Sequence, residues 1–336
     1  MYECFYLLQA NNIMDYLIWI QNLRGEWGEG VEKFFTLFTD GSMAAATFIM
    51  SIFFWCINKR GGKFLFIVYA FGRVLTQFLK NTFCVYRPFI LDSNINPVES
   101  AMKAAQDSYS FPSGHVNMAT MIYGGLAYFY GRKFPILVFS CTVMIVAIAF
   151  SRNFLGVHTL QDVLAAIIST ALLIVFVDKL MAWIGGDEKK ESWITVGGII
   201  LGLIATAYFM LKSYPVDYLD GKIIVEPAEA IKDALGNIGS FSGVIIGLEL
   251  ERRFVKFSTD IAFSKRIFRA VIGVAIILAI NYFAVPFIKS LDIGMATKFV
   301  RWFTLNIFIT FFIPLIFSKL EKIFFKTYTI GGSYYG

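Results

Sequence analysis

Long apolar runs separated by short polar segments recur through this chain of 336 residues. Runs of roughly 16 to 22 mostly apolar residues are long enough to cross a bilayer as helices. The runs that meet this description lie at residues 40–58, 64–80, 112–130, 134–150, 159–183, 192–212, 236–250, 268–288 and 299–318. We therefore expect an all-α protein, a polytopic membrane helical bundle with about nine transmembrane helices.

The composition agrees with a membrane protein and argues against a nucleic-acid partner. Hydrophobic residues make up 57% of the chain and charged residues 16%, a balance that would leave a soluble protein with too much exposed apolar surface. The net charge of +6 comes from basic residues in short segments between the apolar runs. The N-terminus lacks the basic, apolar and small-residue regions of a cleavable signal peptide, so we expect none.

The segment before the first span has a different pattern. Within residues 10–37, apolar side chains such as Ile13, Leu17 and Ile20 recur at helical spacing, with polar residues such as Asp15 and Arg24 between them. This spacing predicts an amphipathic helix that lies at the membrane interface rather than crossing it.

The distribution of basic residues predicts the orientation of the bundle. Basic residues of the connecting segments collect on one side, which should be cytoplasmic: 59–63, 132–133, 189–190, 252–269 and 319–326. The other side carries the remaining segments: the N-terminus, 81–111, 151–158, 213–237 and 289–298. An odd number of spans then places the N-terminus outside and the C-terminus in the cytoplasm.

Three polar motifs interrupt the apolar runs, and all fall on the predicted extracytoplasmic side. The chain has only two histidines: His115 ends Pro-Ser-Gly-His, and His158 ends Ser-Arg-Asn-Phe-Leu-Gly-Val-His, with Asp162 four residues on. Upstream, Lys80 precedes Arg87-Pro88. Because each motif lies at a span end, segments far apart in the sequence can meet at one membrane face.

These residue types suit the cleavage of a phosphate ester. Such a site must neutralise the phosphate oxygens, supply a nucleophile and protonate the leaving oxygen. Lys80, Arg87 and Arg152 can provide positive charge, and the arginines can make paired hydrogen bonds to phosphate. Pro112 suits the first turn of a helix, where free N–H groups, the Ser113 hydroxyl and the close backbone approach allowed by Gly114 could bind an anion.

Asp162 follows His158 at a spacing that places both on one helix face, so its carboxylate can orient one nitrogen of the imidazole ring. No carboxylate cluster with metal-ligand spacing is evident, and the cations can do a metal's electrostatic work. We therefore expect neither a metal nor another cofactor.

The motifs KxxxxxxRP, PSGH and SRxxxxxHxxxD, in this order, resemble the three signatures of the type 2 phosphatidic acid phosphatase superfamily, which vanadium haloperoxidases and glucose-6-phosphatase share. The resemblance covers residues 64–184, about a third of the chain. It implies that His158 is a nucleophile forming a phosphohistidine intermediate and that His115 is the general acid. It also implies that Asp162 orients His158, and that the phosphate-binding residues are Lys80, Arg87, Ser113, Gly114 and Arg152.

The expected domain organisation follows from the spans and motifs. Residues 1–38 would form an extracytoplasmic segment with the interfacial helix, residues 39–184 a catalytic membrane core, and residues 190–336 additional transmembrane helices. The acidic outer segment 216–237 could cover the site as a lid. A disulfide between Cys4 and Cys84 is a minor alternative to free thiols.

Four less certain positions lie near the motifs. Arg73 lies inside a span, where we favour pairing with a buried acceptor over lining a substrate cavity. Asn117 and Asn153 could touch substrate, whereas Ser151 more plausibly positions Arg152.

The leading functional hypothesis is a metal-independent membrane phosphatase that hydrolyses a lipid phosphate monoester or diphosphate. Candidate substrates are phosphatidic acid, phosphatidylglycerol phosphate, a sphingoid or lysolipid phosphate, and a polyprenyl phosphate or diphosphate. One alternative is a phosphatase for a soluble sugar phosphate, because the nine-span layout is similar to that of glucose-6-phosphatase. Another is a head-group phosphotransferase or lipid carrier. We expect a bacterial inner or plasma membrane location, with membrane lipids as partners, and the oligomeric state stays open.

Overall fold

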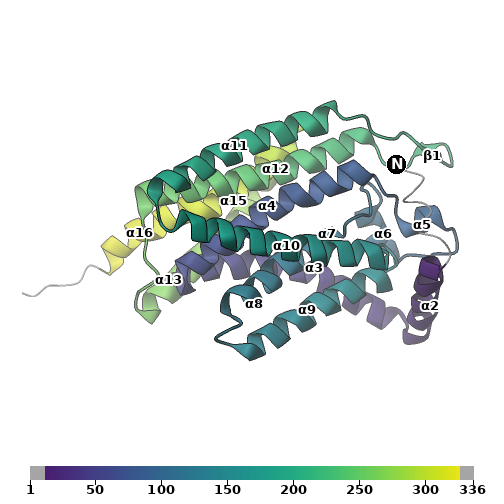
Figure 1. The fold of residues 1–336 in the computed structure, drawn as a ribbon, viewed down its shortest axis with the longest axis horizontal. Coiled ribbons are helices and arrows are strands. Elements are labelled where there is room, and N and C mark those ends of the chain that lie inside the picture. The colour runs from purple at the N-terminus through teal and green to yellow at the C-terminus, as the bar shows by residue number, and fades with distance from the viewer. Residues whose placement is uncertain (1–11, 326–336) are drawn as a thin grey trace, which may run out of the picture.

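The computed structural model describes residues 12–325, and these form a bundle of helices with one short β-hairpin. Most helices run side by side along the long axis (Figure 1). In chain order the helices of the first part are α2 (Asn12–Trp27), α3 (Glu29–Ile52), η1 (Phe53–Ile57), α4 (Lys59–Phe83), α5 (Pro88–Leu91), α6 (Glu99–Ala105), α7 (Gly114–Ala119), η2 (Thr120–Gly124), α8 (Gly125–Tyr130), α9 (Pro135–Phe154) and α10 (Leu160–Ile184).

The second part begins with α11 (Glu188–Leu211) and the hairpin of β1 (Tyr218–Leu219) and β2 (Lys222–Ile223). The remaining helices are α12 (Pro227–Leu250), η3 (Glu251–Val255), α13 (Phe263–Ala279), η4 (Ile280–Ala284), α14 (Val285–Ser290), α15 (Ala296–Ile307), η5 (Phe308–Phe312) and α16 (Ile313–Phe324). The segments labelled η are π-helical turns: η2, η4 and η5 lie within longer helices, and η1 and η3 end the helices that α3 and α12 begin.

Among the described residues, 7 helical segments are long and apolar enough to cross a membrane, fewer than the nine expected. They are Glu29–Ile57, Lys59–Leu91, Pro135–Phe154, Leu160–Ile184, Glu188–Leu211, Phe263–Ser290 and Ala296–Phe324. The predicted spans 112–130 and 236–250 are absent from this set. The first is the short helix from α7 to α8, and the second is part of α12, which is longer than predicted.

The position of α12 explains why its sequence is a weak apolar signal. It lies among α4, α11 and α15, so protein rather than lipid covers much of its surface (Figure 1). Its glycines Gly239, Gly243 and Gly247 face α15 and η5, and a Cβ on Gly243 would lie 2.6 Å from the carbonyl oxygen of Phe303. Small residues allow such close backbone approach between membrane helices.

The N-terminal helices differ in extent from the prediction. α3 begins at Glu29, so residues 29–38 belong to the long helix rather than to a separate interfacial segment. Acidic Glu29 and Glu32 in its first turn suit a helix N-terminus. The remaining α2 crosses the end of the bundle and buries Leu17 and Ile20 against it (Figure 1).

Arg24, which the sequence placed on the polar face of the interfacial helix, is instead buried against protein. Its guanidinium donates a 2.9 Å hydrogen bond to the carbonyl oxygen of Phe154, bonds the carbonyl oxygen of Asn96 and forms an ion pair with Glu32. α2 is thereby fixed to the segments that carry the motifs.

The three motifs lie at one end of the bundle, because the helices that carry them begin or end there. The end of α4, the start of α7 and the loop between α9 and α10 lie there, close to α5 and α6, whereas α13 and α16 extend to the other end (Figure 1). The grouping of segments into two ends is the one expected from the spans. The membrane side that each end faces stays a prediction.

Candidate active site

A cavity of about 150 Å³ lies at the end of the bundle where the three motifs meet. Six of the eight expected site residues line it: Lys80, Arg87, Gly114, His115, Arg152 and His158. Residues of α3 and α6, such as Asp40 and Ala101, and Ser108 in the segment after α6 complete the wall. The remaining two expected residues, Asp162 and Ser113, lie behind this wall.

The start of α10 fixes His158. Thr159 is the N-cap of this helix, and it forms a capping box with Asp162: the Thr159 hydroxyl accepts from the Asp162 N–H, and the carboxylate accepts from the Thr159 N–H at 2.7 Å. His158 directly precedes the N-cap, and its Nδ1 lies 3.3 Å from Oδ2 of Asp162. One carboxylate therefore both starts the helix and orients the imidazole ring.

A serine that the sequence analysis did not single out completes this arrangement. The Ser110 hydroxyl donates a 2.6 Å hydrogen bond to Asp162 and lies 3.3 Å from Nδ1 of His158. The side chain of Asn153 donates to the carbonyl oxygen of His158 at 2.8 Å. Asn153, considered as a substrate contact, is thus a backbone support for His158.

Arg87 holds the other side of the imidazole ring. Its Nη1 lies 2.8 Å from Nε2 of His158 and donates to the carbonyl oxygen of Val157 at 3.0 Å. Ser108 accepts two further hydrogen bonds, through its carbonyl oxygen and its hydroxyl. The same Nη1 lies 3.4 Å from Nδ1, so Nε2 is the nearer of the two ring nitrogens. Because a guanidinium only donates and the carboxylate of Asp162 accepts, we assign Nε2 as the acceptor and place the ring proton on Nδ1, toward Asp162.

The three cations have little compensating negative charge. Lys80 donates to the carbonyl oxygen of Tyr109 at 2.5 Å, and Nε of the buried Arg152 has no hydrogen-bond partner. Within residues 12–325, no ion pair joins Lys80, Arg87 or Arg152 to a carboxylate. Buried unpaired charge is costly, so the cavity is electrostatically suited to an anion.

The same environment keeps His158 neutral. Burial lowers the pKa of His158 well below its usual value of 6.5, and the positive charges of Arg87, Arg152 and Lys80 lower it further. A neutral imidazole with its proton on Nδ1 has a lone pair on Nε2, which is the form that a nucleophile requires.

His115 lies on the more open side of the cavity. Its side chain is 29% exposed, compared with 2% for His158, and its Nε2 lies 3.7 Å from the carboxylate of Asp40 on α3. Asp40 belongs to no recognised motif, and only the packing of α3 against α7 brings it to the site.

Ser113 and Pro112 occupy different positions from those expected. The helix begins at Gly114 with Ser113 as its N-cap, so Pro112 precedes the helix instead of lying in its first turn. The Ser113 hydroxyl is buried without a hydrogen-bond partner, and its backbone N–H donates to the carbonyl oxygen of Asp162. Gly114 lines the cavity, and no atom lies within 4 Å of the position that a Cβ would occupy.

The other residues considered near the motifs lie outside the cavity. The amide oxygen of Asn117 accepts from Thr170 at 2.6 Å, and the Ser151 hydroxyl bonds Thr39. Arg73 stacks on Tyr69 and Trp302, with both rings 5.8 Å away, and forms no ion pair with a described residue. The expected pairing with a buried acceptor is therefore replaced by aromatic contacts.

The outer segment expected to form a lid lies beside the site. Asp217 accepts a 2.7 Å hydrogen bond from Tyr86, and Val225 packs with Tyr86 and Tyr109. No residue of 216–237 is among the described residues that line the cavity.

Cys84 has a free thiol, and Cys4, its alternative partner, lies outside the described residues. Over residues 12–325, no three His, Cys, Asp or Glu side chains converge as a metal site.

Two family models match the chain. The PAP2 superfamily model matches residues 61–185, which contain all three motifs. A model described as the transmembrane extension of PAP2 superfamily phosphatases matches residues 235–323, where the extra C-terminal helices lie.

Individual relatives agree with these matches. Phosphatidylglycerophosphatase B of Bacillus subtilis is 32% identical over 139 residues, covering 39% of this chain and 61% of that protein, so the match spans less than two thirds of the relative. Sphingosine-1-phosphate phosphatase 1 of Rattus norvegicus is 24% identical, covering 88% of this chain and 76% of that protein.

A solved structure, that of a transmembrane PAP2 type phosphatidylglycerolphosphate phosphatase from Bacillus subtilis, is 23% identical with a TM-score of 0.42, covering 55% of this chain and 95% of its own. The three motifs in order and the two matching family models agree: this predominantly helical membrane chain belongs to the PAP2 superfamily.

Proposed function

We propose that this protein is a metal-independent phosphatase that hydrolyses the phosphate monoester or diphosphate of a membrane lipid. The observation that carries the proposal is the excess positive charge of Lys80, Arg87 and Arg152, none of which is ion-paired to a described carboxylate, around a neutral, oriented His158. This combination supplies both an anion site and a nucleophile, which a structural or purely carrier role would not require.

In the first step, the Nε2 lone pair of His158 attacks phosphorus, and the bond from phosphorus to the leaving oxygen breaks. Incoming phosphate would take over the hydrogen bond that Arg87 makes with Nε2 of His158, and Nε of Arg152 is a donor without a partner. Asp162 holds the Nδ1 proton and stabilises the positive charge that develops on the ring. His115 would give a proton to the departing alkoxide, or to the departing phosphate when the substrate is a diphosphate. Burial and the charge of Arg152 lower the pKa of His115 to about 4, and the negative charge of a bound phosphate would favour its protonated form.

In the second step, His115 is neutral and can take a proton from water at the open side of the cavity. The resulting hydroxide attacks phosphorus, and the phosphorus–nitrogen bond breaks. The electron pair returns to Nε2 of His158, and inorganic phosphate leaves. His115 is protonated again, so the cycle closes with one water consumed.

The size of the cavity favours a lipid over a soluble sugar phosphate. Sites that enclose a small molecule usually have volumes of roughly 300–1,000 Å³, and this cavity has about 150 Å³. It can take a phosphate group while the rest of the substrate stays outside, as a lipid anchored in the bilayer would. The predicted location of this end at the extracytoplasmic face supports a substrate of the outer leaflet.

The test is phosphate release by detergent-purified protein in EDTA. Substrates are phosphatidylglycerol phosphate, phosphatidic acid, sphingosine phosphate, a polyprenyl diphosphate and glucose 6-phosphate. We expect release from at least one lipid and its loss in His158→Ala. Acid-labile, base-stable phosphorylation of the wild-type protein, absent from His158→Ala, would report the intermediate. Release from glucose 6-phosphate alone, or none at all, would overturn the proposal.

A further inference from the structure

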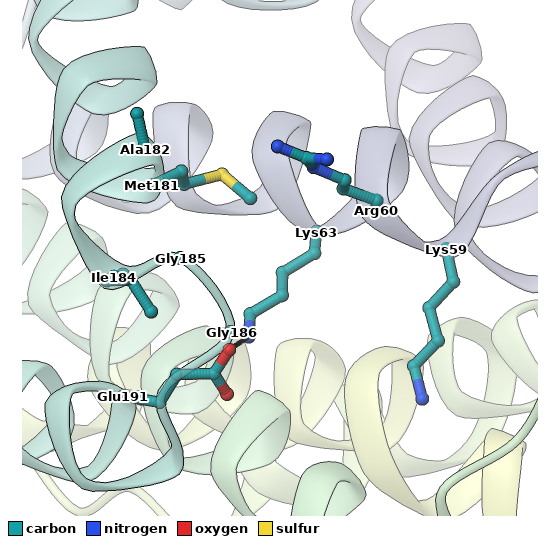
Figure 2. Close-up of a pocket in the computed structure, with 9 residues that line it drawn as sticks. All are labelled: Lys59, Arg60, Lys63, Met181, Ala182, Ile184, Gly185, Gly186 and Glu191. Atoms are coloured by element: carbon teal, nitrogen blue, oxygen red, sulfur yellow. Dashed lines mark ion pairs between the residues drawn. The ribbon is translucent and has the colours of Figure 1, made fainter.

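A second polar cavity, of about 490 Å³, lies at the end of the bundle opposite the candidate active site. It is formed where α4 begins and where α10 gives way to α11, and Figure 2 shows its lining residues. Its cationic residues are Lys59, Arg60 and Lys63 on α4, and its carboxylate is Glu191 on α11. None of these residues belongs to the three motifs.

The cations differ in whether they are already paired. Lys59 binds Glu251 at 2.6 Å and the carbonyl oxygen of Phe257 at 3.0 Å, and its amine lies apart from those of the other two in Figure 2. Lys63 binds Glu191 at 2.8 Å. Arg60 has no ion pair or side-chain hydrogen bond with a described residue, and it extends along the cavity toward Met181 (Figure 2).

The carboxylate that faces Lys63 is shared. Glu191 also pairs with Arg252 at 3.2 Å, and Arg252 in turn binds Glu249. Arg252 is also paired with Glu188, so the carboxylates of this network balance its cations and Lys63 stays paired. The unpaired charge in the cavity is that of Arg60. The cavity is left with donors and positive charge for an anionic group, and a guanidinium is well suited to a phosphate.

The surroundings of the cavity match the depth of lipid headgroups. Trp183 at the end of α10 is 57% exposed, and exposed tryptophans concentrate at membrane interfaces. Lys190 lies over the Trp183 ring at 4.8 Å. Beside the cavity lies a narrow cleft that shares Lys63, Ile184 and Glu191 with it. Its other lining residues are mostly apolar, among them Ile67, Ile194 and Leu248, together with Thr195 and Glu249.

We propose that this cavity binds the phosphate of an anionic membrane lipid, held by Arg60 and Lys63, with the start of its apolar part against the cleft. Basic pockets between transmembrane helices are a known way of holding acidic headgroups. The site would take a lipid from the leaflet opposite the one that supplies the candidate active site. It does not depend on the proposed phosphatase activity.

The experiment measures binding to purified full-length protein by native mass spectrometry, with the thermal midpoint in detergent as a second readout. The probes are dioleoylphosphatidylglycerol, the zwitterionic dioleoylphosphatidylcholine and inorganic phosphate. The variants are Arg60→Gln, the charge-retaining Arg60→Lys, and Lys322→Gln as a matched control. Lys322 is an exposed cation at the same end but outside the cavity.

We expect phosphatidylglycerol to bind the wild type and Lys322→Gln equally, and Arg60→Gln about fivefold more weakly, with Arg60→Lys closer to wild type. Phosphatidylcholine and inorganic phosphate should give little retention or thermal protection. Equal binding by wild type and Arg60→Gln would overturn the site. Protection by inorganic phosphate equal to that by phosphatidylglycerol would overturn the lipid assignment, and an equal loss in Lys322→Gln would show nonspecific charge attraction.

Discussion

Nη1 of Arg87 lies 2.8 Å from Nε2 of His158, the nitrogen that would attack phosphorus. An arriving phosphate must therefore displace this hydrogen bond, and its oxygens are the natural new acceptors for the guanidinium. In the proposed mechanism, Arg87 covers the lone pair when the cavity is empty and would bind phosphate when it is filled.

This relationship predicts that charge alone cannot replace Arg87. Arg87→Lys keeps a cation but loses the planar fork, and we expect kcat/KM to fall about 10²-fold and vanadate to inhibit more weakly. Arg73→Lys is the matched control, because Arg73 lies outside the cavity and should retain activity. Comparable losses in the two variants would mean that Arg87 has no special role.

The second prediction concerns the protonation of His158. With only two histidines in the chain, isotope-labelled histidine gives two sets of signals, and His115→Asn assigns them. Because burial and Arg87 lower its pKa, His158 should stay neutral, with its proton on Nδ1, as the pH falls from 8 through 6.5. Protonation of His158 near pH 6.5 would contradict this electrostatic picture.

The third prediction distinguishes the roles of His115 and His158 by comparing substrates with different leaving groups. His115→Ala should slow hydrolysis of a lipid phosphate about 10²-fold or more, because an alkoxide needs a proton to leave. The same variant should hydrolyse p-nitrophenyl phosphate with a much smaller loss, since nitrophenolate leaves without one. His158→Ala should lose both activities.

Asp40 allows a fourth prediction that tests positioning of His115. Since its carboxylate lies 3.7 Å from Nε2 of His115, Asp40→Asn should lower activity on the lipid about tenfold and spare p-nitrophenyl phosphate. A purely structural role would lower both activities together. Asp40→Glu should restore part of the rate on the lipid.

The fifth prediction addresses the packing of α12. Gly243→Ala places a Cβ against the carbonyl oxygen of Phe303, so we expect destabilisation of about 1–3 kcal/mol and a lower thermal midpoint in detergent. Gly197→Ala on α11 is the matched control, because no atom lies within 4 Å of its Cβ position. Equal midpoints for the two variants would mean that the close approach is unimportant.

Most of the residues predicted from the motifs do line the cavity. The motifs lie at or next to helix ends, and the apolar runs show in the sequence where those helices end. The capping box of Thr159 and Asp162 could have been identified from its Thr-x-x-Asp spacing. Asp40 and Ser110 could not, because their proximity to the histidines depends on how α3 and the segment before α7 pack. The helix at 236–250 was predicted too short, because α12 is enclosed by other helices and its N-terminal part needs no continuous apolar surface.

Because the cavity is small, two parts of the protein would recognise a substrate: the cavity itself and the surfaces around its mouth. A chamber that admits little more than one phosphate treats every monoester in the same way, so it cannot discriminate among lipids by their backbones or tails. Discrimination among lipids must therefore come from the helix surfaces around the mouth of the cavity, which include those of α3 and α6. Exchanging these surfaces should change which lipid is dephosphorylated while the reaction itself stays the same.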